Sequence, residues 1–154
     1  MKIAIAIISV LAFTVLAGLF GLLFRVWPTS WPDSALKISP IQIEQLKQIR
    51  SEEKFHEDTK SPYPGAVNEA SRDSLETAVN KTIDLIIPVI QQSPKKSTIL
   101  GIFKPVLTNL IFLDSEDKDQ LLNYFSRVLQ TVGVQSSNEL FNVWRYGFPY
   151  GWFN

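Results

Sequence analysis

An uninterrupted apolar segment near the amino terminus constrains this chain more than any other feature. Residues 3 to 24, IAIAIISVLAFTVLAGLFGLLF, contain no charged side chain. A helix of this length would extend roughly 33 Å, which is enough to cross the hydrocarbon core of a bilayer. The segment therefore predicts a transmembrane helix, with the lipid bilayer as the partner of residues 3–24.

The residues on either side of this segment leave two interpretations open, an uncleaved anchor and a cleaved signal peptide. Lys2 and a passable cleavage site before Gly18 fit a signal peptide. However, the run exceeds the usual apolar length of a signal, and Arg25, Trp27 and Trp31 follow it, where the headgroup layer would lie. Indole rings and snorkelling arginine side chains favour that layer. We favour the anchor, with these three residues at the membrane interface.

The chain divides into a transmembrane anchor (1–26), a Trp/Pro linker (27–38) and a helical domain (39–154). Two Trp-Pro pairs exclude a regular helix from the linker, because proline bars the residue before it from the helical region. The positive charges on the two sides of the anchor are nearly balanced, so they decide little about orientation. A short amino-terminal tail before a large domain favours export. We predict a single-pass protein of a bacterial inner (cytoplasmic) membrane, with the domain on the periplasmic side.

Charge and cysteine content exclude several classes of partner and site. Fifteen basic and fifteen acidic residues give a formal net charge of zero, and the two signs are interspersed. No basic stripe appears, so we expect no nucleic-acid partner. The chain has no cysteine, which removes disulfides and thiolate metal sites.

Helical periodicity recurs throughout residues 39–154, and no segment shows a sustained strand pattern. Ser39, Pro40 and Gln42 predict a capped helix that runs to Phe55. Further helices are predicted at about 69–92, at 98–113, where an apolar surface nearly all round indicates the most central helix, and from 115 to just before Gly133. Ser136 and Glu139 predict a capping box for a last, short helix. The predicted fold class is all-α, a bundle of four or five helices.

Two groups of polar residues are candidates for chemistry, and neither is convincing. The acidic run Asp114, Glu116, Asp117 and Asp119 departs from a calcium loop, because Asp119 stands where the glycine is needed. His56, the single histidine, has no identifiable nucleophile to serve. We therefore predict no catalytic residue, no metal and no cofactor.

The carboxy terminus is rich in aromatic residues. From Phe141 the chain reads FNVWRYGFPYGWFN, with seven aromatic residues in fourteen positions. Phe141, Trp144 and Phe148 are expected to pack on the core. Tyr150, Trp152 and Phe153 are candidates for a partner-binding surface, because exposed Tyr and Trp rings suit interfaces.

Three short motifs carry a resemblance to a known family. They are Tyr63-Pro64-Gly65, the helix start Phe112-Leu113-Asp114-Ser115-Glu116-Asp117, and Trp144-Arg145-Tyr146-Gly147-Phe148. Over about Tyr63 to Phe148 the chain resembles a small all-helical bacterial family, domain of unknown function 4844. The resemblance implies a compact helical domain in a bacterium. It implies no activity, ligand or catalytic residue.

Three functional hypotheses follow from the sequence. The first is a membrane-anchored protein-interaction module, which the anchor, the spacer and the aromatic tail all favour. The second is a periplasmic immunity or inhibitor protein that blocks a toxin. The third is an enzyme with an unrecognised site, which a buried polar cluster lining a deep pocket would favour.

Overall fold

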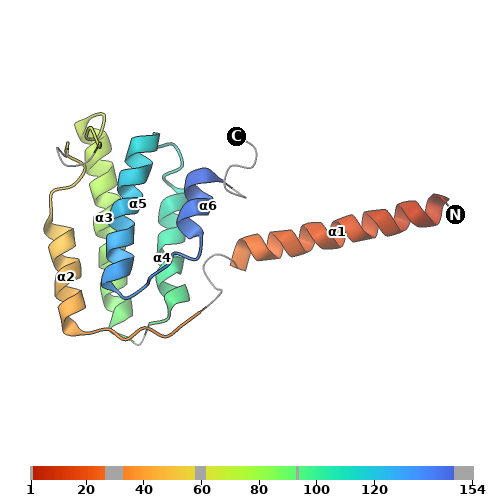
Figure 1. Ribbon diagram of the computed structural model, residues 1–154, viewed down its shortest axis with the longest axis horizontal. Coiled ribbons are helices and arrows are strands. Elements are labelled where there is room, and N and C mark those ends of the chain that lie inside the picture. Colours follow the sequence, from red (N-terminus) through yellow and green to blue (C-terminus); the bar gives the residue numbers. More distant parts are fainter. Residues whose placement is uncertain (1, 27–32, 58–61, 93, 148–154) are drawn as a thin grey trace.

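The computed structural model describes residues 2–26, 33–57, 62–92 and 94–147, and within the first range it describes side chains at position 3 and from 5 to 21. These ranges contain six helices (Figure 1), namely α1 (Lys2–Val26), α2 (Pro40–Ser51), α3 (Glu69–Ile90), α4 (Lys96–Thr108), α5 (Ser115–Thr131) and α6 (Leu140–Tyr146). An isolated bridge between Ala35 and Lys95 is the one β-type pairing among the described residues. The described chain is therefore all-helical, as the sequence predicted.

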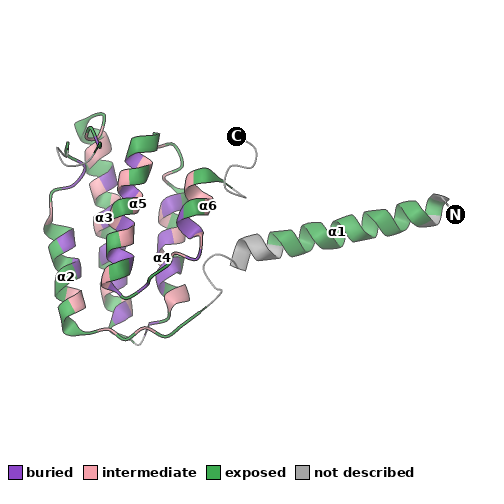
Figure 2. Cartoon of the chain, viewed as in Figure 1, coloured by how far each residue is buried: buried purple, intermediate pink, exposed green. Residues whose placement is uncertain are grey.

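Helix α1 stands apart from the other helices and packs against none of them in the described part of the chain (Figure 1). Its described side chains are all exposed (Figure 2). Among the described residues, no helix combines the length and the apolar character that a membrane crossing requires. We therefore correct the prediction of a transmembrane helix, which this finding does not support.

Helices α2 to α6 pack around one hydrophobic core with α3 at its centre. Helix α3 contacts α2, α4 and α5, while α6 packs against α4 and α5. The rings of Phe103, Phe125 and Phe141 meet in the core, with centroids 4.9, 5.8 and 6.2 Å apart. Helix α4 was predicted to be the central helix. Instead, only one face of α4 is buried, and Gly101 and Pro105 lie on its exposed face.

Local sequence signals fix two helix ends as predicted. At the start of α2, the backbone N–H of Ser39 donates to Oε1 of Gln42 at 2.7 Å, which is half of a capping box. At the end of α5, Gly133 adopts a φ of 78°, and the N–H of Val134 donates to the carbonyl oxygen of Leu129 at 2.9 Å. A left-handed glycine followed by a residue that folds back is a common way to end a helix.

Helix α2 ends at Ser51, earlier than predicted, because tertiary contacts draw the next residues out of the helix. Lys54 is fully buried, and its ammonium group donates to the carbonyl oxygens of Arg50 at 3.0 Å and Glu52 at 2.6 Å. These bonds satisfy carbonyls that the helix end leaves open. Phe55 then takes a φ of 60°, and its side chain is buried in the core.

The carboxyl half of the predicted linker is hydrogen-bonded to the helical domain. The N–H of Leu36 donates to the carbonyl oxygen of Pro94 at 2.9 Å. A carboxylate oxygen of Asp33 accepts from the N–H of Ser97 at 2.9 Å, at the start of α4. The backbone bond from Ser97 lowers the pKa of Asp33. Asp33 therefore contributes to the start of α4 from 64 positions away in the chain.

Candidate functional site

Most of the residues that the sequence selected as sites lie outside the described part of the chain. This is so for Trp27 and Trp31 in the linker and for Tyr150, Trp152 and Phe153 in the tail. The side chain of Arg25 is also not described. Their roles at a membrane interface and in partner binding stay predictions.

The aspartates of the acidic run contact different parts of the protein and do not form one group. Asp114 is the N-cap of α5 and accepts from the N–H of Asp117 at 2.8 Å. Asp117 points into the core, and Asp119 points toward α6, where it pairs with Arg145. Within residues 33–57, 62–92 and 94–147, no three histidine, aspartate or glutamate side chains form a group that could hold a metal ion.

His56 lies at the surface beside the start of α3. Its Nε2 atom is 2.7 Å from Nη1 of Arg72, and its ring is 3.7 Å from a carboxylate oxygen of Glu53. Arg72 can only donate hydrogen bonds, so in this arrangement the ring nitrogen is the acceptor. The hollow around His56 is lined by Gly65, Arg72 and neighbouring residues, and the described part of this lining includes no serine or threonine.

The three motifs that carried the family resemblance meet at the first two turns of α5. The Tyr63 hydroxyl donates to the buried carboxylate of Asp117 at 2.6 Å. The Arg145 guanidinium binds both carboxylate oxygens of Asp119, at 2.5 and 3.1 Å. The ammonium group of Lys118 lies 5.9 Å from the centre of a Trp144 ring, within cation–π range. We call this group the α5 cluster, and it fastens both the α2–α3 loop and α6 to α5.

The pKa values of the two carboxyl groups in the α5 cluster are shifted in opposite directions. Burial raises the pKa of Asp117, against the lowering effect of the bond from Tyr63. Burial also raises the pKa of the Tyr63 hydroxyl, which keeps that group a hydrogen-bond donor. The bond from Arg145 instead lowers the pKa of Asp119. The contacts of the cluster join the α2–α3 loop and α6 to the start of α5, which gives these residues a structural role.

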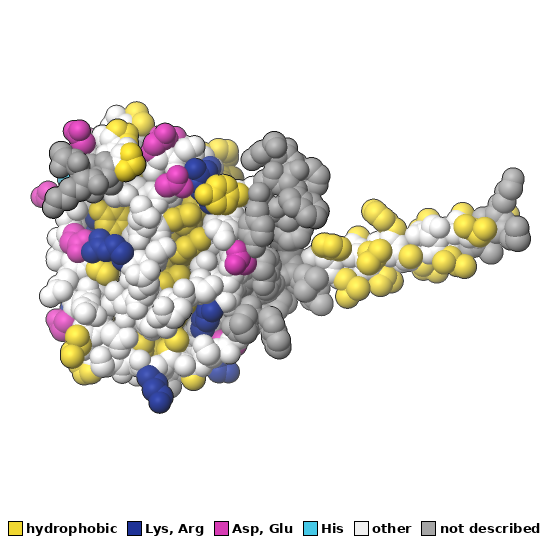
Figure 3. Space-filling view, in the orientation of Figure 1, with side chains coloured by type: hydrophobic (Ala, Val, Ile, Leu, Met, Phe, Trp, Pro, Cys, Tyr) yellow, Lys and Arg dark blue, Asp and Glu magenta, His cyan; other side chains and the backbone are white. Residues whose placement is uncertain are grey.

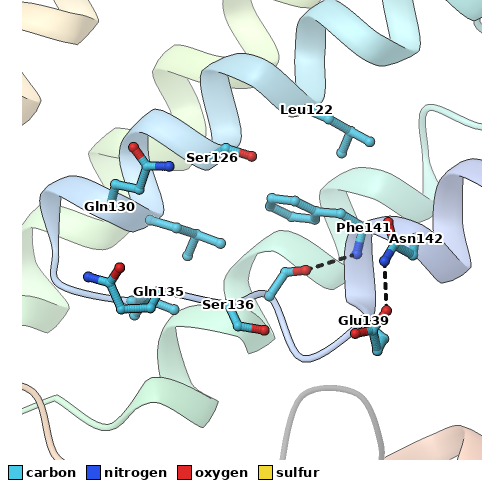
Figure 4. Close-up of a pocket in the computed structure, with 11 residues that line it drawn as sticks. Leu122, Ser126, Gln130, Gln135, Ser136, Glu139, Phe141 and Asn142 are labelled. Carbon is cyan, nitrogen blue, oxygen red and sulfur yellow. Dashed lines mark hydrogen bonds between the residues drawn. The ribbon is translucent and has the colours of Figure 1, made fainter.

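A separate groove lies between the second half of α5, the loop 134–139 and α6 (Figure 4). Its volume is about 340 Å³, at the low end of the range for small-molecule sites. Hydroxyl and amide groups line much of it, from Ser126, Gln130, Gln135, Ser136, Ser137 and Asn142. Leu122, Leu129, Val134 and Phe141 supply the apolar part of the lining.

The rim of this groove contains two consecutive residues in the left-handed region. Asn138 and Glu139 both have positive φ values, 49° and 67°, and stand directly before α6. Lys96 donates to the side-chain carbonyl of Asn138, and Asn142 donates to the carboxylate of Glu139 at 2.6 Å. The predicted capping box is therefore wrong, because Glu139 occupies the left-handed N-cap position of α6, with no side-chain cap bond. Such conformations persist only where surrounding contacts impose them.

The groove offers neutral hydrogen-bonding groups and one carboxylate, that of Glu139. Among the described residues that line it, none is basic, so they supply no counter-charge for a phosphate. The same residues include no histidine or lysine that could act as a base for the serines. Sequence reasoning missed this groove, because residues from three elements line it and the one motif among them, Ser136 with Glu139, indicated only a helix start.

Comparison with known proteins identifies a solved structure and a family that this chain resembles. A crystal structure of a DUF3571 family protein from Acinetobacter baumannii AYE is similar, with a TM-score of 0.64 and 32% sequence identity, over 70% of this chain and 89% of that one. No curated protein matches the chain. Residues 37–149 match a family described as Domain of unknown function (DUF4844), which confirms the resemblance and extends it to α2. The chain therefore belongs to the DUF4844 family of domains of unknown function.

Proposed function

We propose that this protein is a lipid-associated protein-interaction module, in which α1 binds lipid and the five-helix domain presents its surface to a protein partner. The exposed apolar side chains of α1 carry the proposal. The proposal concerns their burial among acyl chains and does not require that the helix crosses a bilayer.

The apolar side chains of α1 need an apolar environment on every side. Ile3, Leu11, Phe13 and Val15 are 60% or more exposed, and apolar side chains lie all along the helix (Figure 3). The hydroxyl of Thr14 donates to the carbonyl oxygen of Val10 at 2.8 Å, so even this polar group is satisfied within the helix. A helix that packs in one protein groove needs a single apolar stripe. A helix that is apolar all round is better matched by lipid chains, which surround it.

The domain supports a binding role more than a catalytic one. Its surface carries interspersed charges of both signs (Figure 3), and several pairs bridge neighbouring helices. Arg50 binds Asp84 across α2 and α3, and Arg127 of α5 binds Glu52, which follows α2. The described groove and the α5 cluster hold no nucleophile with a base beside it. We therefore expect this surface to bind a partner through its shape and its polar groups.

Flotation of the full chain with lipid vesicles tests the proposal. Leu11→Lys with Val15→Lys places two charges on α1, and Ile41→Lys with Val67→Lys places the same charges at exposed apolar positions of the domain. We expect the original chain and the domain variant to float with phosphatidylcholine vesicles, while the α1 variant stays at the bottom. Flotation of the α1 variant at the level of the original chain would contradict lipid binding by α1.

The side of the membrane on which the domain lies is part of the proposal. We place it on the outer, periplasmic side of a bacterial inner membrane. The chain has no cysteine, so a single Val67→Cys substitution at a 77% exposed position gives a specific label. A maleimide that enters the periplasm but not the cytoplasm should label it in intact cells. Labelling only after the inner membrane is broken would contradict this orientation.

A further inference from the structure

The segment that precedes α2 is paired with the start of α4. Residues 33–36 form an antiparallel bridge with the residues that precede and begin this helix. The N–H of Leu36 donates to the carbonyl oxygen of Pro94 at 2.9 Å, and the N–H of Lys96 donates to that of Ser34 at 2.8 Å. We call residues 33–36 the strap. In Figure 1 the strap runs past the start of α4 on its way to α2.

The strap supplies the cap that the start of α4 lacks. The N-cap residue of α4, Lys95, makes no side-chain cap bond. A carboxylate oxygen of Asp33 instead accepts from the N–H of Ser97 in the first turn, at 2.9 Å. The first N–H groups of a helix have no partner within it, and a side-chain oxygen that accepts from one of them stabilises the first turn. Asp33 therefore has the role of an N-cap for α4, although it lies 64 positions from Ser97.

The same helix turn holds the rim of the groove. Lys96 is the first residue of α4, and its ammonium group donates to the side-chain oxygen of Asn138. Asn138 is 8% exposed, has a φ of 49°, and stands between Ser137 and Glu139, which both line the groove. Left-handed conformations of residues other than glycine persist only where surrounding contacts impose them. Opening of the first turn of α4 would carry the Lys96 ammonium away from Asn138 and remove this support.

We propose that the strap controls the groove, so that the rim keeps its left-handed conformation while the strap is paired with α4 and loosens when the strap is released. The steps are the uncapping of α4, the opening of its first turn and the loss of the bond from Lys96 to Asn138. Coupling between distant sites needs a contiguous network with two arrangements, and hydrogen bonds join each part of the route from Asp33 to Asn138.

The position of the strap in the chain gives this coupling a direction. The strap is the part of the domain that follows α1 and the linker in sequence, so a force on the α1 side of the chain reaches the domain at Asp33 first. The groove would then respond to the state of the tether without contacting it. This inference does not depend on lipid binding by α1.

Amide hydrogen exchange in the full chain tests the coupling. Asp33→Ala removes the cap of α4, and Asp33→Asn restores an oxygen that can accept from Ser97. The N–H groups of Leu140 and Val143 report on the rim, because they donate to its carbonyl oxygens at 3.0 and 2.8 Å. We expect Asp33→Ala to speed exchange about fivefold in the first turn of α4 and at these two amides, the size of effect that loss of a helix cap allows. Asp33→Asn should return both regions toward the original rates.

Two further variants separate this route from a general loss of stability. Asn68→Ala is the matched control, because it removes the corresponding cap of α3, where the Asn68 side chain accepts from the N–H of Ser71 at 2.9 Å. It should speed exchange at the start of α3 and leave the rim unchanged. Lys96→Met removes the bond to Asn138 but keeps the backbone bond to the strap. It should speed exchange at the rim, and adding Asp33→Ala to it should have no further effect there.

Three results would overturn the proposal. The first is rim exchange that stays at the original rate in Asp33→Ala. The second is an equal increase at Val79 and Ile83 in the buried face of α3, since the substitution would then weaken the whole domain. The third is a rim that responds to Asn68→Ala as strongly as to Asp33→Ala, or that responds to Asp33→Ala equally with and without Lys96, because the contacts described here would then not carry the effect.

Discussion

The hydroxyl of Tyr63 donates a 2.6 Å hydrogen bond to the buried carboxylate of Asp117, and this bond joins the α2–α3 loop to the first turn of α5. The two residues are 54 positions apart in the chain. Both are largely removed from water, with exposures of 6% and 4%. A buried carboxylate without its donor is strongly unfavourable, so the loop and the helix depend on one another.

Tyr63→Phe should destabilise the domain by about 1.5–3 kcal/mol, because it removes a hydrogen bond to a charged group and leaves that group buried. Tyr146→Phe is the matched control, since Tyr146 is half exposed, and it should change the free energy of unfolding by less than about 0.5 kcal/mol. Urea unfolding of the two variants and the original chain measures both effects. Equal losses in the two variants would show that the buried bond contributes nothing specific.

Asp117→Asn should reveal the raised pKa of Asp117 through the pH dependence of stability. A carboxyl whose pKa is higher in the folded than in the unfolded state binds its proton first in the folded state. Protonation of Asp117 therefore favours folding as the pH falls from neutral, through the raised folded pKa, to the ordinary value of 3.8. Asn does not titrate in this range. The original chain should gain stability relative to the variant between pH 7 and pH 4, and a loss would contradict the raised pKa.

Local signals in the sequence were enough to predict several helix boundaries. Carboxylates at Asp114 and Glu116 and the glycine at 133 place α5 correctly, because both effects act within one turn of the helix. The same holds for the start of α2 at Pro40. The family resemblance also came from short local motifs, and the family match confirms it.

Contacts between distant segments could not be predicted in this way. Phe55 is buried in a left-handed conformation that helical periodicity does not predict, so the predicted helix ran four residues too far. Ser136 and Glu139 have the spacing of a capping box, but the bond from Lys96 holds the preceding Asn138 in a left-handed conformation. The groove beside them exists only once α5 and α6 are packed together. Hydropathy alone likewise predicted a transmembrane span that the described residues do not support.

Substitutions at Glu139 test the strain at the groove rim. Its φ of 67° suits glycine, whereas a residue with a Cβ atom pays about 1–2 kcal/mol in this conformation. Glu139→Gly and Glu139→Ala both remove the bond to Asn142, so the difference between them isolates the backbone term. We expect the glycine variant to be more stable than the alanine variant by about 1 kcal/mol in urea unfolding. Equal stability, or a more stable alanine variant, would show that the rim is not strained.

Arg145→Met tests the second charge pair of the α5 cluster, with a pH dependence opposite to that of Asp117. The bond from Arg145 lowers the pKa of Asp119, so the pair contributes stability above the ordinary value of 3.8 and loses it as the pH falls through the lowered folded value. Asp119 is half exposed, so we expect a loss of only about 0.5–1 kcal/mol at pH 7. Lys47→Met, which breaks the exposed pair with Glu44, is the control and should change little.

The difference between the Arg145→Met variant and the original chain should shrink as the pH falls from 5 toward 3, because protonated Asp119 no longer gains from the guanidinium. A difference that stays constant over this range would assign the loss to packing of the arginine stem. Over the same pH series, the difference in stability between the original chain and Asp117→Asn should therefore grow as the pH falls. The difference between the original chain and Arg145→Met should shrink. That contrast distinguishes Asp117, whose pKa is raised by burial, from Asp119, whose pKa is lowered by a charged partner. The two residues lie on the same turn of α5.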